Sequence, residues 1–160
     1  MSSLRGQLYA RAACQPEALA RLVDWSETLR TAVPPRMAQA IALTVSVRAG
    51  SAYQRLEHER LALACGLTEE EVQALEAGNL SRAPSLSEEE GAAAALTRCM
   101  LDNFGHGCEP AFLRLSRLVG EPTAVACLMI AASASSEAAM ANVWGLELPP
   151  APETAGVAAE

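Results

Sequence analysis

The sequence contains no lysine, few aromatic residues and no excess of positive charge. Its twelve basic residues are all arginine, and they are outnumbered by nineteen acidic residues, which gives a net charge of −7. Nucleic acids and anionic lipid surfaces bind basic surfaces, so we expect neither nucleic-acid binding nor membrane association. Hydrophobic residues make up 51% of the chain and charged residues only 19%, a composition that predicts a folded protein rather than a disordered one.

The chain also lacks a CxxC motif and long apolar runs. Its five cysteines, at positions 14, 65, 99, 108 and 127, are odd in number and form no CxxC motif. This pattern does not favour a secreted disulfide framework. The N-terminal segment has no continuous apolar stretch of the signal-peptide kind, and the run Ala124 to Ala134 is too short to cross about 30 Å of hydrocarbon. We therefore expect a cytoplasmic protein.

Aromatic residues account for only 4% of the sequence and alanine is abundant, which favours helices over strands. Proline, glycine and capping residues divide the chain into expected helices at about 4–13, 16–31, 36–49, 51–66, 68–78, 87–104, 110–120 and 122–144. The sequence predicts one all-α domain of six to eight helices over residues 1–148. Residues 149–160, which are rich in proline and small residues, are predicted to form a flexible tail.

Helix starts carry recognisable signals. Thr68 with Glu71 and Ser87 with Glu90 each have the spacing of a capping box, in which the side chain and backbone of both residues exchange hydrogen bonds. Ser51 is predicted to cap the fourth helix. We interpret the acidic runs Glu69–Glu71 and Glu88–Glu90 as structural, because carboxylates in the first turn of a helix interact favourably with the helix dipole.

The most informative stretch begins at Ser51. Ser51, Gln54 and His58 are spaced i, i+3, i+7, so they share one face of a helix whose N-terminus favours negative charge. With cysteine at the first two positions, the same geometry would place a dithiol beside an imidazole.

This pattern resembles the carboxymuconolactone decarboxylase family, which includes the AhpD-like alkylhydroperoxidases and is marked by a glutamate, eleven residues and then CxxCxxxH. Gln39 stands at the glutamate position, Ser51 and Gln54 at the cysteine positions, and His58 at the histidine position. Tyr53 fits a cysteine-less branch of the family. Further along, the segment Gly66-Leu67-Thr68-Glu69-Glu70-Glu71-Val72 is similar to the family's helix turn, and the likeness covers about Leu19 to Leu148. The resemblance implies an AhpD-like helical fold, a homo-oligomer such as a trimer or hexamer, and peroxidase or lactone-decarboxylase activity.

The substitutions change the expected chemistry. Ser51 and Gln54 cannot run a thiol–disulfide cycle, and Gln39 cannot act as a general base. Glu57 and Glu59 point about 100° away from His58 around the helix. We therefore expect no peroxidase activity of the CxxC kind, and any remaining chemistry to be acid–base work by His58 on a small organic molecule.

Two alternatives stay open. One is a non-catalytic helical oligomer that binds a small ligand or partner in the former active-site cleft, with His58 packed among apolar walls. The other is a rearranged redox protein that uses Cys65, Cys99 or Cys108, which requires two sulfurs whose Cα atoms lie within about 7 Å. The motif His106-Gly107-Cys108 offers only two ligands and is interpreted as a helix end, so neither a metal nor a cofactor is predicted.

The resemblance also implies that the third and fourth helices pack antiparallel after the break at Gly50, which would bring Gln39 to His58. An amide at position 39 supplies no charge, so burial is expected to lower the pKa of His58 and keep the imidazole neutral.

Overall fold

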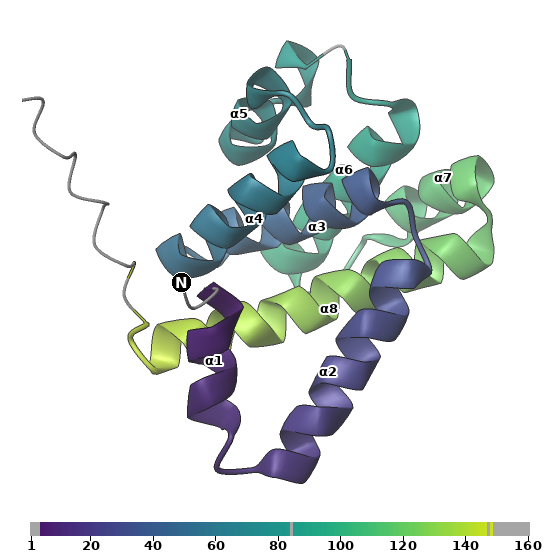
Figure 1. Cartoon of the computed structure of the whole chain (residues 1–160). Helices are drawn as coiled ribbons and strands as arrows, with labels where there is room; N and C mark the ends of the chain where they lie inside the picture. The colour runs from purple at the N-terminus through teal and green to yellow at the C-terminus, as the bar shows by residue number, and fades with distance from the viewer. Residues whose placement is uncertain (1–3, 84, 147, 149–160) are drawn as a thin grey trace, which may run out of the picture.

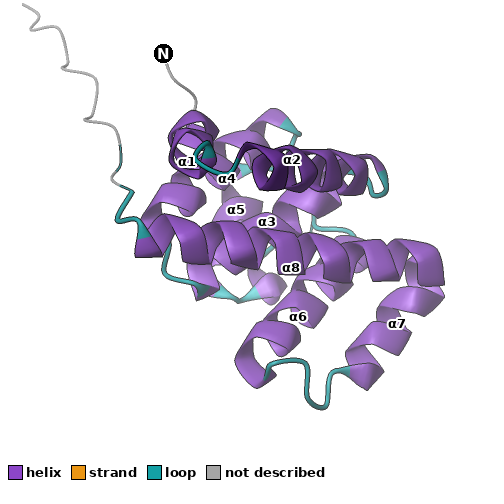
Figure 2. Cartoon of the chain, turned by 90° about the horizontal axis from the view of Figure 1, so that it is seen from below, coloured by secondary structure: helices purple, strands orange, loops and turns teal. Residues whose placement is uncertain are grey.

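The computed structural model describes residues 4–83, 85–146 and 148, and this part of the chain consists of helices and short connections with no strand (Figures 1 and 2). The elements are α1 (Leu4–Ala12), α2 (Pro16–Thr31), α3 (Pro35–Arg48), α4 (Ala52–Ala64), α5 (Glu69–Ala77), the 3₁₀ helix η1 (Leu80–Arg82), α6 (Glu88–Asn103), α7 (Glu109–Val119) and α8 (Glu121–Val143). The all-α prediction is confirmed. Helix η1 lies in a segment expected to be a loop, and the expected tail 149–160 lies outside the described residues.

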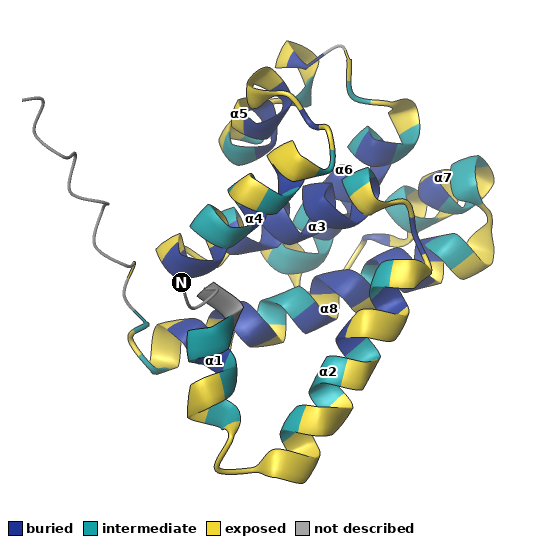
Figure 3. Ribbon diagram, viewed as in Figure 1, coloured by how far each residue is buried: buried dark blue, intermediate teal, exposed yellow. Residues whose placement is uncertain are grey.

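Helix α3 is the centre of the fold. Every residue from 37 to 46 is buried, so this helix is covered all round, by α4 and α5 on one side and by α6 and α8 on others (Figure 3). Such coverage requires small or apolar side chains at nearly every position. Ile41 and Leu43 are fully buried, and alanines fill the spaces at which neighbouring helices approach. The polar residue Gln39 is therefore held within the core.

Helix α8 crosses the molecule beneath α3. Viewed from below, it runs between the α1–α2 side and the α6–α7 side (Figure 2). By length and composition α8 could cross a membrane, yet half of its most apolar window is buried inside the protein. Its apolar character is thus explained by packing, because Ala124, Ala131 and Ala138 are completely buried in the main core.

Both predicted capping boxes are present. The hydroxyl of Thr68 accepts from the Glu71 backbone N–H at 3.2 Å while the Glu71 carboxylate accepts from the Thr68 N–H at 2.7 Å. Ser87 and Glu90 form the equivalent pair, with both bonds at 3.1 Å. These bonds satisfy N–H groups that the first turn of a helix leaves unpaired.

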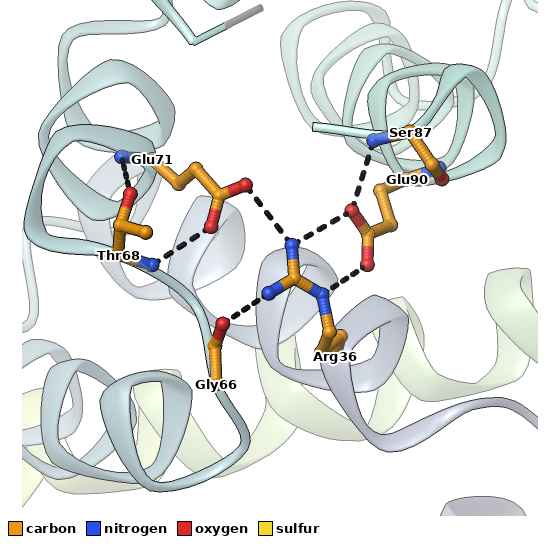
Figure 4. A network of polar contacts seen from close by, with 6 residues as sticks. All are labelled: Arg36, Gly66, Thr68, Glu71, Ser87 and Glu90. Atoms are coloured by element: carbon orange, nitrogen blue, oxygen red, sulfur yellow. Dashed lines mark hydrogen bonds and ion pairs between the residues drawn. The ribbon is translucent and has the colours of Figure 1, made fainter. Parts of the chain in front are cut away.

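Arg36 joins the two capping boxes (Figure 4). Its guanidinium donates to Glu71 Oε1 at 3.0 Å and to Glu90 Oε1 at 2.8 Å, and it also donates to the carbonyl of Gly66. Burial raises the pKa of Glu71, but hydrogen bonds from the Thr68 N–H, Ser85 and Arg36 outweigh burial and set the pKa below its ordinary value. One arginine on α3 thereby fixes the starts of α5 and α6.

Gly78 ends α5 in the left-handed conformation, with φ of 65°. A Cβ there would lie 2.7 Å from Nη1 of Arg98, which donates to the Gly78 carbonyl. The position therefore requires glycine for its backbone angle and for the close approach of Arg98.

The ends of α4 and α6 follow the predictions with two differences in detail. Ser51 is the N-cap residue of α4, as predicted, but its side chain forms no capping bond. Helix α6 ends at Asn103, one residue before the expected end, and its C-cap Phe104 adopts the left-handed conformation with φ of 52°. The segment 104–107 then turns the chain back so that Cys108 meets Cys99.

Candidate functional site

A tight turn brings the third and fourth helices together. Gly50 adopts φ of 62°, and the N–H of Ser51 donates to the carbonyl of Ser46 at 3.0 Å across the turn. The two helices then pack against each other. As expected, this places Gln39 of α3 against His58 of α4, with Gln39 Oε1 and His58 Nδ1 3.0 Å apart.

This contact orients the imidazole. An amide oxygen can only accept a hydrogen bond, so Nδ1 of His58 is the donor in this contact. Both side chains are buried, with His58 4% exposed and Gln39 8% exposed. The contact and the burial therefore hold the ring in one orientation.

Gln39 and His58 line a small cavity of about 40 Å³ between α2, α3, α4 and α8. Its polar lining consists of Ser26, Arg30, Gln39, His58, Ser133 and Glu137, and its apolar lining of Leu29, Ala38, Ala42, Ile130 and Ala134. The wall is therefore mixed, with its polar groups contributed by four different helices.

The sequence interpretation missed four of these polar residues. Ser26 and Arg30 come from α2, and Ser133 and Glu137 come from α8. Of the four, Ser26, Ser133 and Glu137 are buried. Ser26 Oγ donates to Glu137 Oε1 at 3.2 Å and lies 3.2 Å from Ser133 Oγ. One sequence signal did exist, because Glu137 is the only charged residue between positions 122 and 143, a stretch composed mostly of alanine and other uncharged residues.

The other motif positions lie outside the cavity lining. Ser51 and Gln54 are 1% and 2% exposed, and among the described residues Ser51 Oγ and both amide atoms of Gln54 have no hydrogen-bond partner. Tyr53 packs with Leu8 and Ala141, and burial raises the pKa of its hydroxyl. The face of α4 that carries Ser51, Gln54 and His58 is thus polar and buried. Of these three residues, only His58 lines the cavity.

Glu59 follows His58 in the chain but pairs with a different residue. The helix geometry predicted that its side chain would point away from His58. Glu59 pairs with Arg55 at 2.8 Å, and Arg55 also lies 3.4 Å from Glu76. Burial raises the pKa of Glu76, and the nearby Glu59 carboxylate raises it further. This charge cluster belongs to the outer side of α4 and α5.

Cys99 and Cys108 form a disulfide between the end of α6 and the start of α7, with Cα atoms 5.7 Å apart. Cys14, Cys65 and Cys127 are free, so Cys65 takes no part in a described pair. Burial raises the pKa of the Cys127 thiol to about 11, which makes it a poor nucleophile. Cys108 also borders an apolar cavity lined by Trp25, Met100 and Phe112.

Within the described residues, no three histidine, cysteine, aspartate or glutamate side chains gather closely enough to hold a metal ion. His106 lies on the exposed turn after α6.

This arrangement of helices is the AhpD-like fold. The chain is similar to a crystal structure from Agrobacterium tumefaciens, described as a protein of unknown function and a candidate antioxidant defence protein AhpD. The TM-score is 0.77 at 18% sequence identity, and the match covers 87% of this chain and 95% of the other. No family model and no curated protein matches the sequence.

Proposed function

We propose that the cavity between α2, α3, α4 and α8 is a small-molecule site in which His58 performs acid–base chemistry. The observation that carries the proposal is the 3.0 Å contact between His58 Nδ1 and Gln39 Oε1 inside a cavity with further polar walls. When the ring is neutral, this contact places the proton on Nδ1 and the lone pair on Nε2, and a neutral imidazole is the form that a general base requires.

The cavity limits the substrate. A water molecule needs roughly 10–15 Å³ of such volume, so about 40 Å³ admits a few waters or one reacting group. The hydroxyl oxygens of Ser26 and Ser133 keep lone pairs that can accept a hydrogen bond from a substrate hydroxyl. These features suit a small oxygenated organic molecule, such as a lactone or a keto acid, whose reacting end enters the cavity.

The alternative of a non-catalytic binding protein predicted apolar walls around His58. The walls instead carry a carboxylate, two hydroxyls and an amide, and this polar lining favours the acid–base proposal. Ser51 and Gln54 point the same way, since they keep buried polar atoms on the same helix face.

Proton exchange at carbon tests the proposal. The protein is incubated in D₂O with γ-butyrolactone and with acetoacetate, and loss of the α-proton signal is followed by NMR. We expect exchange above the buffer rate for at least one compound, and its loss in His58→Gln. Replacing the exposed His106 with Gln is the matched control and should leave the rate unchanged. Equal rates for wild type and His58→Gln with both compounds would contradict the proposal.

A second candidate function is supported by the Cys99–Cys108 disulfide. The pair meets the distance requirement of a rearranged redox protein, and reduction by a dithiol would give two thiols and one oxidised reductant. Alkylation followed by mass spectrometry tests whether the pair cycles. Two additional modified cysteines are expected after dithiothreitol treatment, with the bond re-formed by oxidised dithiothreitol. Five modified cysteines without reductant would contradict it.

The cytoplasmic location and the homo-oligomeric state expected from the sequence remain part of the proposal. A disulfide in a reducing compartment is commonly a transient one, which fits the second candidate function.

A further inference from the structure

We propose that Glu137 is the charge partner of His58 in this cavity and supplies, from α8, the carboxylate that Gln39 does not provide. Glu137 thus acts as a positioning residue that stabilises the imidazolium formed when His58 takes up a proton. The inference rests on the proposed function for its catalytic meaning.

The first argument is burial. Glu137 is 5% exposed and lies in a helix whose other residues from 122 to 143 are uncharged. A buried carboxylate is costly unless it is paired, and a well-packed apolar residue is often the more stable choice. A carboxylate that persists within a core helix and borders a cavity is a candidate functional group.

The second argument is the direction of the hydrogen bonds. Ser26 donates its one hydroxyl proton to Glu137 Oε1. In the contact between the two serines, Ser133 is therefore the donor and Ser26 the acceptor. The chain from Ser133 through Ser26 therefore ends at the carboxylate. This arrangement fixes the carboxylate of Glu137 beside the cavity.

The third argument is the charge balance of the cavity wall. Three titratable or charged groups line it, Arg30 from α2, His58 from α4 and Glu137 from α8, while α3 contributes the neutral Gln39. The Arg30 side chain is 38% exposed, lies 4.0 Å from Glu27, and donates from Nε to the backbone carbonyl of Ser26. Water screens a charge exposed to that degree, which leaves His58 and Glu137 as the two buried titratable groups of this cavity wall.

Titration of His58 by NMR tests the inference without relying on turnover. The protein has two histidines, so the exposed His106 is an internal reference in the same spectra. We expect Glu137→Gln to lower the pKa of His58 by about one unit, as loss of a nearby opposite charge does. The exposed Glu121 of α8 provides the matched control, and Glu121→Gln should leave the pKa of His58 unchanged.

A His58 shift in Glu137→Gln no larger than that in Glu121→Gln would overturn the inference. If Glu137→Gln does not fold, Glu137→Met, which removes the charge at similar volume, is titrated in the same way and decides the question. The outcomes of the two experiments are distinguishable. If proton exchange depends on His58 but the pKa of His58 does not shift in Glu137→Gln, only the role of Glu137 is refuted. If the pKa shifts but proton exchange does not depend on His58, only the proposed function is refuted.

Discussion

Gln39 and His58 lie on different helices, nineteen positions apart in the chain, and their side chains meet at 3.0 Å in the core. The partner of the imidazole is thus an amide, which orients the ring without adding charge. This relationship leads to the first prediction.

Gln39→Glu should raise the pKa of His58, because a carboxylate at hydrogen-bond distance stabilises the imidazolium. A rise of about one to three units is expected. NMR titration measures it, and Gln39→Met, which lacks both charge and hydrogen bond, serves as the control. An unchanged pKa in Gln39→Glu would mean that the new side chain turns away from the ring.

Ser51 and Gln54 should carry no peroxidase chemistry, since neither supplies a thiolate. Any peroxide consumption supported by dithiothreitol is expected to be the same in Ser51→Ala as in wild type and to disappear in Cys99→Ser. The rate is followed by loss of hydrogen peroxide. A rate that falls in Ser51→Ala but persists in Cys99→Ser would contradict this assignment.

Arg36→Met should destabilise the protein by about 2–4 kcal/mol, because it leaves the buried carboxylates of Glu71 and Glu90 without their cation. The Arg36 side chain is 32% exposed, which places the expected cost below that of a fully buried pair. Urea unfolding measures the change. Arg114→Met is the control, because its pair with Glu88 is exposed on both sides and should contribute less than about 1 kcal/mol. Similar losses in both variants would contradict the bridging role of Arg36.

Acid should destabilise the fold through Glu71. Its pKa is lowered in the folded state from the ordinary value of 4.5, so the unfolded chain takes up a proton more readily. The stabilisation is therefore present above about pH 4.5 and is lost as the pH falls through the lower, folded pKa. Unfolding free energies measured between pH 3 and pH 6 should show a shallower pH dependence in Glu71→Gln than in wild type. Identical slopes would assign the acid sensitivity to other carboxylates.

Self-association is expected from the apolar side chains left at the surface. Phe104 is 93% exposed, and Leu113, Val125 and Met129 are each at least 40% exposed, a pattern typical of interaction surfaces. Light scattering on the purified protein should give a mass that is a multiple of 16.8 kDa. A monomer mass at micromolar concentration would contradict the expectation.

The sequence by itself determined the helices and their ends to a large extent. Proline at helix starts, glycine at helix ends and the Thr68–Glu71 and Ser87–Glu90 capping boxes are local signals, which depend on residues only a few positions apart. The meeting of Gln39 and His58 was also predictable, from the family resemblance together with the break at Gly50 between their helices.

Only the tertiary structure decided what surrounds His58. Ser26 and Glu137 are 111 positions apart, and nothing in either local sequence indicates that α2 and α8 meet beside α4. The same holds for Arg36, whose two carboxylate partners lie 35 and 54 residues away. Long-range contacts of this kind follow from how whole helix faces pack, and such packing depends on all the helices at once rather than on any one segment.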